Sequence, residues 1–284
     1  MGVACIAVFL AICRLVQQHC NIVFTPWRSR PFSAKPSSSS LSGFCPMAFI
    51  PVTREQHSGK FLLPLSSFAH AAKSAAVEVV LGELAQVTAC YPMFFIRQGE
   101  GYHLVALLGM KQGENLYVDR AGRWTGLYVP AMLRAYPFTM VPQNGQLSVF
   151  YDEASGLLSD KEGEPLFGTG EGEPNGPLAR AIKLLTELNL DGERTAKLAK
   201  QLADYGLLKA ATLKMDRSGQ PGEALDGIFA VDEAALGGLG DEAFLGLRRS
   251  GALILAHAQM LSLGQLGRLQ AEANIRDRDN ARLS

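Results

Sequence analysis

The stretch GENLYVDRAGRWTGLYVPAMLRAYPF, residues 113–138, combines a short strand pattern, a turn, a tryptophan and a proline-bounded helix. In DRAGRW, Asp119 and Gly122 have the Asp-to-Gly character of a hairpin turn, so backbone geometry explains them better than ligand binding does. Pro130 is tolerated near the start of a helix, and Pro137 closes it. The stretch therefore predicts a strand, a turn and a short helix, one after the other.

Alternating or apolar runs within this stretch and on both sides of it predict strands. Turn signals rich in glycine separate them, which is typical of adjacent antiparallel strands. The runs are MFFIRQ, YHLVALLG, ENLYVD, FTMV and QLSVFYD, at residues 93–98, 102–109, 114–119, 138–141 and 146–152. Together they predict a meander of about five strands crossed by one short helix. The alanine-rich segment before them, residues 68–92, is compatible with helix until Pro92 ends it.

Helical spacing dominates the second half of the chain. Residues 178–190 and 193–206 each place apolar side chains on one stripe, and the second pattern stops at Gly206. Strand-like runs follow at residues 207–215 and 227–232. The predicted fold class is α+β: an antiparallel sheet of about five or more strands in the first half, packed with helices from the second half and the C-terminus.

The last section reads as helical. Asp232 and Asp241 stand where N-caps would precede two short helices. The apolar run at residues 251–263 predicts a buried helix, because it is too short to span a membrane. We expect residues 271–284 to form a polar C-terminal tail that frays.

Residues 1–46 differ in character from the rest of the chain. Their apolar run, residues 2–13, is too short for a spanning helix, and no lysine or arginine precedes it as in a secretory signal. A basic stretch rich in serine and proline follows, and the character changes at Met47. We interpret residues 1–46 as an extension from a mis-assigned start, with a targeting segment as the alternative, and residues 47–270 as one α+β domain.

Composition limits the partners that the chain can have. The 27 lysines and arginines balance 27 aspartates and glutamates, so no global field attracts nucleic acid.

Four of the five cysteines fall in the first 45 residues, and Cys90 alone remains in the body. We expect no disulfide framework, no metal and no cofactor, with Cys90 as a small buried hydrophobe. This cysteine usage indicates a reducing compartment, so we expect a cytoplasmic protein, or an envelope-associated one if residues 1–46 are a targeting segment.

The acidic segment at residues 152–177 is rich in glycine and proline. Its Asp160, Glu162 and Glu164 alternate as calcium ligands do, but Pro165 stands where an EF-hand loop needs its glycine. We interpret the segment as a solvated loop, with a weak cation site as the alternative. The chain has no GxSxG, Walker or HExxH motif, and no GxGxxG follows a strand.

An aromatic and cationic group surrounds the short helix of the opening stretch. Arg123, Trp124, Arg134 and Tyr136 suit recognition of a carboxylate or a sugar, although Trp124 and Tyr136 could equally pack in the core. His257 interrupts an apolar helix, where it must find a hydrogen-bond partner or stay neutral. We interpret His257 as a satisfied core histidine, with a ligand or a base as the alternative.

Five strings carry a resemblance to a known family. They are ALLGMKQGENLYVDRAGRW, YVPAMLRAYPF, GEPLF, LDGIFAVDEAAL and QMLSLGQLGRL, in this order and spacing. The series resembles the bacterial SapC-related family and covers roughly residues 47–270. The resemblance implies a link to a bacterial surface layer, and it supplies no catalytic motif.

Two classes of function stay open. The first is a non-catalytic accessory or binding protein for surface-layer or envelope assembly or uptake, whose partner is an envelope or surface-layer component or a small anionic ligand. The resemblance and the lack of a catalytic signature favour this class. The second is an enzyme of unrecognised type, with a polar pocket near Arg123, Arg134, Tyr136, Asp152 and His257. Convergence of these side chains in one concave pocket would separate the two classes.

Overall fold

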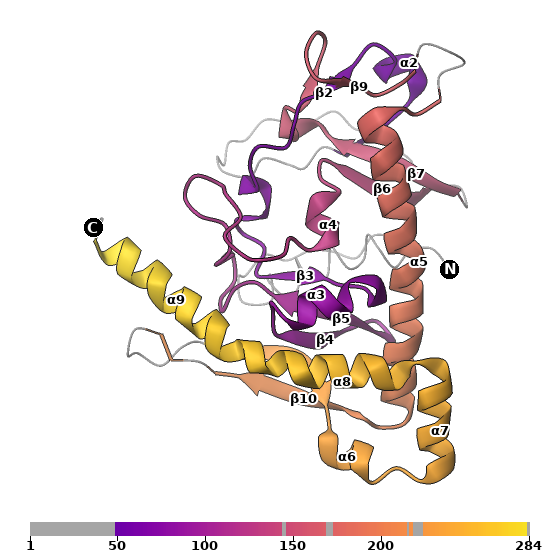
Figure 1. Ribbon diagram of the computed structural model, residues 1–284, viewed down its shortest axis with the longest axis vertical. Coiled ribbons are helices and arrows are strands. Elements are labelled where there is room, and N and C mark those ends of the chain that lie inside the picture. Colours follow the sequence, from indigo (N-terminus) through magenta and orange to yellow (C-terminus); the bar gives the residue numbers. More distant parts are fainter. Residues whose placement is uncertain (1–48, 144–145, 169–172, 215, 218–223, 283–284) are drawn as a thin grey trace, which may run out of the picture.

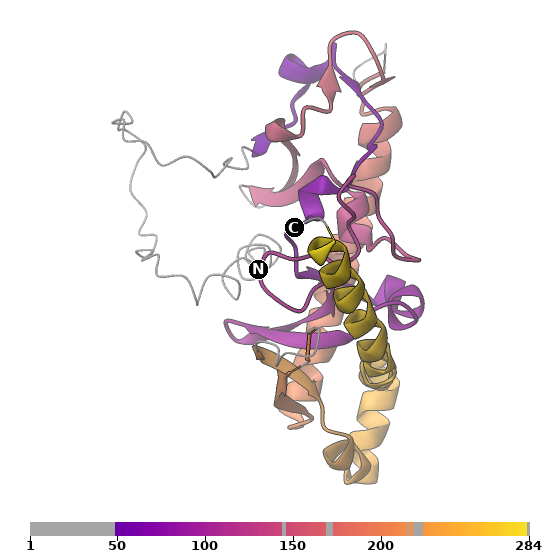
Figure 2. The same ribbon diagram turned by 90° about the vertical axis from the view of Figure 1, so that its left-hand side faces the viewer.

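Figure 1 shows the computed structural model, which describes residues 49–143, 146–168, 173–214, 216–217 and 224–282. The molecule is elongated. Helix α5, Gly176–Asp204, runs along it beside two groups of strands (Figures 1 and 2). The predicted extension, residues 1–46, lies outside the described residues.

The larger group is a five-stranded antiparallel sheet with the order β10-β11-β4-β5-β3. Within it, the β4–β5 hairpin places Phe95 opposite Leu104, and β11 pairs with the other edge of β4. This sheet and the surrounding helices confirm the α+β fold class. The strands are β3 (Ala76–Glu78), β4 (Met93–Gln98), β5 (Gly101–Leu107), β10 (Leu208–Leu213) and β11 (Leu225–Val231).

The smaller group consists of two three-stranded sheets, with the orders β1-β7-β6 and β8-β2-β9. The prediction of one meander through the first half is therefore wrong in its connectivity. The short helix α4, Ala131–Arg134, lies between β5 and β6 and carries the chain from the large sheet to the small ones. The strands are β1 (Phe49–Pro51), β2 (Phe61–Leu62), β6 (Phe138–Gln143), β7 (Gln146–Asp152), β8 (Leu158–Ser159) and β9 (Glu164–Pro165).

Residues 114–119 do not form the predicted strand. The side chain of Asn115 donates from Nδ2 to the carbonyl of Ala71 and accepts at Oδ1 from the Tyr117 amide. The backbone amides of Asn115 and Leu116 donate to the carbonyls of Ala72 and Leu108, so these bonds hold the segment in place of a strand ladder. A single bridge joins Val118 to Trp124 around the turn. The turn itself is confirmed, because Asp119 Oδ1 accepts from two following backbone amides and Gly122 has a φ of 77°.

The alanine-rich segment, residues 68–92, is only partly helical. It contains the 3-10 helices η1 (Ala69–Ala71) and η2 (Leu81–Glu83) and the short helix α3 (Leu84–Thr88). Between them lies β3, which pairs with β5. The prediction of helix is wrong here because β-branched Val77 is buried more favourably on the sheet edge than on an isolated turn.

The two helices predicted at residues 178–190 and 193–206 are one helix, α5. Gly192 costs such a helix about 1 kcal/mol relative to alanine. Burial on both sides of Gly192 offsets this cost, since Leu185 and Leu188 are buried before it and Ala199 and Leu202 after it. The helix ends before Gly206, whose φ of 69° suits a C-terminal glycine.

The C-terminal section contains four helices in the described residues. Asp232 caps the first by accepting from two backbone amides, as predicted, whereas Gly240 rather than Asp241 occupies the N-cap of the second. The helices are α6 (Glu233–Gly237), α7 (Asp241–Ser250), α8 (Ala252–Ser262) and α9 (Leu266–Ala281), with the 3-10 helix η4 (Leu263–Gln265) between the last two.

The expected polar tail joins the body as far as Ala281, because it continues α9. Arg276 Nη2 donates to the carbonyl of Val118 at 2.7 Å. Arg217 forms ion pairs with Glu114 at 2.6 Å and with Asp277 at 2.8 Å, and all three side chains are largely buried. These contacts hold the helix to the loop that follows β5.

The buried side chains form two main hydrophobic clusters. The main core lies between the five-stranded sheet, the C-terminal half of α5, and α7, α8 and α9. The small core lies between the small sheets, the residue Ala135 and the N-terminal half of α5. Among the described residues, no helix is both long enough and apolar enough to cross a membrane.

Candidate functional site

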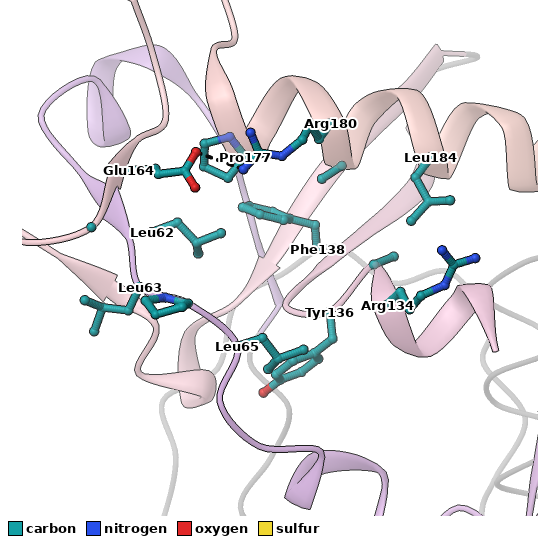
Figure 3. Close-up of a pocket in the computed structure, with 14 residues that line it drawn as sticks. Leu62, Leu63, Leu65, Arg134, Tyr136, Phe138, Glu164, Pro177, Arg180 and Leu184 are labelled. Atoms are coloured by element: carbon teal, nitrogen blue, oxygen red, sulfur yellow. Dashed lines mark hydrogen bonds and ion pairs between the residues drawn. The ribbon is translucent and has the colours of Figure 1, made fainter. Parts of the chain in front are cut away.

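A groove opens beside the small core, between the chain after β2 and the first turns of α5 (Figure 3). Its volume is about 430 Å³. Apolar side chains make up most of its walls, and the charged ones lie at its ends. The lining residues are Leu62, Leu63, Pro64, Leu65, Arg134, Ala135, Tyr136, Phe138, Gly163, Glu164, Pro177, Arg180, Ala181 and Leu184.

Local backbone geometry sets the walls of this groove. Along α5, Pro177, Ala181 and Leu184 follow the spacing that places side chains on one face of a helix. On the opposite wall, Gly163 has a φ of 112°, and a Cβ there would lie 2.3 Å from the Leu62 carbonyl oxygen. Only glycine permits this approach, so the loop before β9 can close against β2.

The two arginines of the groove have different surroundings. Arg180 Nη2 lies 2.8 Å from Glu164 Oε2, and both side chains are exposed. Arg134 Nη2 instead donates to the hydroxyl of Tyr128 at 3.2 Å, and its guanidinium lies over the Tyr128 ring. Within the described part of the chain, no carboxylate lies at ion-pair distance from Arg134. The charge of Arg134 is therefore available to a ligand.

A buried glutamate supports Arg134 from behind. Glu83 is 4% exposed, and its Oε2 accepts from the Tyr128 hydroxyl and from the Ala131 amide, both at 2.9 Å. Its Oε1 accepts from the Val80 amide. Burial raises the pKa of Glu83, and these hydrogen bonds and Arg134 oppose the rise. The network fixes α4, and with it Arg134, against η2.

Tyr136 lines the groove with its ring but directs its hydroxyl away to a buried carboxylate. The hydroxyl donates to Asp152 Oδ2 at 3.0 Å, and Asp152 is 3% exposed. Burial, and then the hydrogen bond to Asp152, raise the pKa of Tyr136. The phenol therefore stays neutral at physiological pH and acts as a fixed wall.

His70 stacks on Tyr136, with ring centroids 3.7 Å apart and ring planes 6° from parallel. Neither ring nitrogen has a hydrogen-bond partner of good geometry in the described part of the chain, although the Ser67 backbone lies close enough to favour the charged ring. Burial lowers the pKa of His70 to about 4, against the opposing charge of Asp152. The imidazole is therefore neutral at physiological pH.

The structure brings together three of the six residues that the sequence singles out. Arg134 and Tyr136 line the groove, and Asp152 lies one hydrogen bond behind Tyr136. Arg123 does not line it, because its exposed side chain forms an ion pair with Asp119 at 2.8 Å.

Trp124 packs with aromatic rings at the edge of the main core. It contacts the rings of Phe68, Tyr91 and Tyr117, and its Nε1 donates to the Tyr128 carbonyl at 2.9 Å. These contacts support the core-packing interpretation of Trp124.

His257 lies on the outer face of α8, away from the lining of the groove. Its Nδ1 is 2.7 Å from the Leu253 carbonyl oxygen, within its own helix. The prediction that His257 is a buried core histidine is wrong because α8 buries Leu255, Ala256 and Gln259 instead.

Sequence reasoning missed the apolar walls, Arg180 and His70. Arg180 stands within a helical pattern, and nothing in its spacing distinguishes it from a solvated residue. Glu164 lies in the segment predicted as a solvated loop and its side chain is exposed, but it pairs with Arg180 at the rim of the groove. In the same segment, Asp160 pairs with Lys60. Over the described ranges, no three His, Cys, Asp or Glu side chains gather closely enough to hold a metal ion.

Comparison with known proteins places the chain in a family. No curated protein and no solved structure matches it. The family model described as SapC matches residues 52–269, which is most of the chain. The chain therefore belongs to the SapC family.

Proposed function

We propose that this protein is a non-catalytic binding protein that serves bacterial surface-layer or envelope assembly or uptake, and that the groove beside the small core is its binding site. One observation carries the proposal: the groove has apolar walls and one arginine, Arg134, without a carboxylate partner among the described residues. Concave apolar sites with a few fixed polar groups are the usual form of ligand sites. The family membership supports the surface-layer link.

The groups in the groove support binding more than catalysis. A nucleophile or a general base needs a free polar atom within reach of the ligand. The Tyr136 hydroxyl donates to Asp152 behind the wall, and Glu164 is held by Arg180. The remaining lining side chains, apart from the arginines, are apolar.

Cytoplasmic location is part of the proposal, and its support is the single cysteine of the body. Cys90 is free and buried. Envelope association is the alternative, for the case in which residues 1–46 are a targeting segment. Fractionation of cells that express the full chain distinguishes the two locations.

A variant that fills the groove tests the proposed site. Ala181 lies on the groove face of α5 and is buried, so Ala181→Trp should block the groove. Ala179 lies on the exposed face of the same helix, so Ala179→Trp is a matched control. The measurement is ligand-induced thermal stabilisation across a library of carboxylates, peptides, sugars and amphiphiles.

We expect at least one compound class to stabilise the wild type and Ala179→Trp but not Ala181→Trp. Unliganded melting and circular dichroism must first show that Ala181→Trp is folded, since overpacking costs about 1–3 kcal/mol. A ligand that stabilises all three proteins equally binds elsewhere and contradicts the proposed site. A library without any ligand contradicts the proposed function.

An enzyme is the second candidate, and His70 is the observation that favours it. In the described part of the chain, neither buried ring nitrogen of His70 has a hydrogen-bond partner of good geometry, which costs folding free energy, and such groups in native proteins often have a functional role. Mass spectrometry of each bound compound after incubation tests this candidate. Conversion that is lost in both His70→Gln and Tyr136→Phe would favour an enzyme over the proposed binding protein.

A further inference from the structure

We infer that the groove binds a single-chain amphiphile: an aliphatic chain lies along α5, and its carboxylate or phosphate head group pairs with Arg134. This inference rests on the proposed function and names the ligand class of the same site.

The walls of the groove suit an aliphatic chain. Between the charged ends, the lining consists of leucine, proline, alanine, phenylalanine and the ring of Tyr136. From Pro177 to Leu184, α5 advances by about 10 Å at 1.5 Å per residue. Leu62 and Leu184 pack against the small core but remain partly exposed, so a chain in the groove would cover apolar surface that now faces water.

The charges give the ligand a direction. Figure 3 shows Glu164 and Pro177 toward one end of the groove, Arg134 and Leu184 at the other, and Phe138 between them. Arg180 pairs with Glu164 at 2.8 Å, whereas in the described part of the chain no carboxylate lies at ion-pair distance from Arg134. The nearest charge that acts on Arg134 is buried Glu83, behind the Tyr128 hydroxyl. A guanidinium offers a planar fork of donors that matches a carboxylate or a phosphate. The head group therefore belongs at the end with Arg134.

The pairing of β2 argues against an extended peptide in the groove. A peptide that adds to a sheet needs an unpaired edge, because main-chain hydrogen bonds supply much of its affinity. β2 is the central strand of its sheet: Phe61 lies opposite Ser159 on one side and Pro165 on the other. The next amide, Leu63, donates to the Leu157 carbonyl. An aliphatic chain needs none of these groups.

Calorimetric titration of the full chain with defined amphiphiles tests the inference. The probes are dodecanoate, dodecyl phosphate, octanoate, dodecanol and dodecyltrimethylammonium, each below its micelle concentration. We expect dodecanoate or dodecyl phosphate to bind, and the stronger of the two identifies the head group. Octanoate should bind at least ~10-fold more weakly, because each buried methylene contributes to affinity. The cationic amphiphile should bind most weakly.

Variants at two arginines separate the head-group contact from a general effect of charge. Arg134→Gln should weaken the anionic amphiphile about tenfold or more while leaving dodecanol binding unchanged, which shows that the apolar groove is intact. Arg134→Lys should keep part of the affinity. Arg194→Gln, a control at an exposed arginine of α5 that pairs with Asp191 and does not line the groove, should change affinity less than about threefold.

Each outcome bears on the inference. Equal binding of dodecanol and dodecanoate, or equal affinity of the wild type and Arg134→Gln for dodecanoate, overturns the head-group assignment. If peptides or sugars bind the groove in a way that Ala181→Trp blocks, and amphiphiles do not, the inference fails while the proposed binding function stands. If no compound of any class binds, both fail together.

Discussion

The two cores of this protein differ in how completely secondary structure closes them. In the main core, β4 and β5 are central strands, and side chains such as Phe95, Leu104 and Leu202 are fully buried. Beside the small core, the sheet at the groove is built from β2, β8 and β9, which have 2 residues each, and Leu62 and Leu184 stay partly exposed there. A closed core stabilises the fold, whereas the open one leaves a concave apolar surface for a ligand.

The largest expected effect tests the closure of the main core directly. Phe95→Ala should cost about 3–5 kcal/mol of unfolding free energy, because a fully buried ring leaves a cavity. Phe138→Ala should cost less, since the groove already leaves part of the space beside Phe138 unfilled. Urea denaturation of both variants measures the difference. Equal costs would mean that the two cores are equally closed.

The second-largest expected loss of stability concerns the ion-pair network that anchors α9. Arg217→Met should destabilise the protein by about 3 kcal/mol, because buried Glu114 would lose both hydrogen bonds from Arg217. The exposed Lys111, 3.9 Å from Glu114, offsets only part of this loss. Thermal unfolding at neutral pH measures this loss. A variant as stable as the wild type would show that this network contributes little to the anchoring of α9.

A smaller effect concerns the stability of the protein in acid, which depends on His70, the residue that stacks on Tyr136 in the groove wall. The folded-state pKa of His70, about 4, lies below its ordinary value of 6.5, so the unfolded chain binds the proton first as pH falls. Stability is fully present above pH 6.5 and declines toward pH 4. The decline should be about 1 kcal/mol after allowance for solvent screening at the partly exposed ring.

His70→Phe keeps a ring against Tyr136 but removes the titrating group. The variant should therefore lose less stability than the wild type between pH 6.5 and pH 4, as measured by urea midpoints at several pH values. Identical pH profiles would show that the His70 imidazole is as well solvated in the folded protein as in the unfolded chain.

The smallest expected effect concerns Arg123, an exposed residue in the turn at residues 119–124. Arg123→Met breaks the ion pair with Asp119, but the arginine side chain is 77% exposed. The loss should stay within about 0.5 kcal/mol, and dodecanoate affinity should be unchanged. A clear loss of ligand affinity would extend the binding site beyond the groove.

Local patterns predicted the elements that depend on local chemistry. The runs at residues 93–98 and 227–232 lie in β4 and in and just after β11, Asp232 caps α6, and Asp119 with Gly122 forms the turn. Each of these depends on periodicity, on a cap or on a backbone conformation that neighbouring residues determine.

The groove could not be predicted in the same way. Its leucines stand at positions 62, 63, 65 and 184, and tertiary packing alone brings Leu184 to the other three. The edge strand β3 was missed for a related reason, since its pairing with β5 outweighs the helical preference of the alanines around it. The sequence suggests Arg134 for a polar pocket that also includes Arg123 and His257, whereas the structure places Arg134 beside apolar walls and without a carboxylate partner among the described residues.

Leucine-methyl NMR during a titration with dodecanoate tests most directly whether the open core is the binding region. The methyl signals of Leu62, Leu65 and Leu184, which line the groove, should shift in proportion to occupancy. Those of Leu104, Leu202 and Leu255, fully buried in the main core, should stay in place. Shifts confined to main-core leucines, or no shifts at concentrations where calorimetry reports binding, would contradict the assignment of the groove as the site.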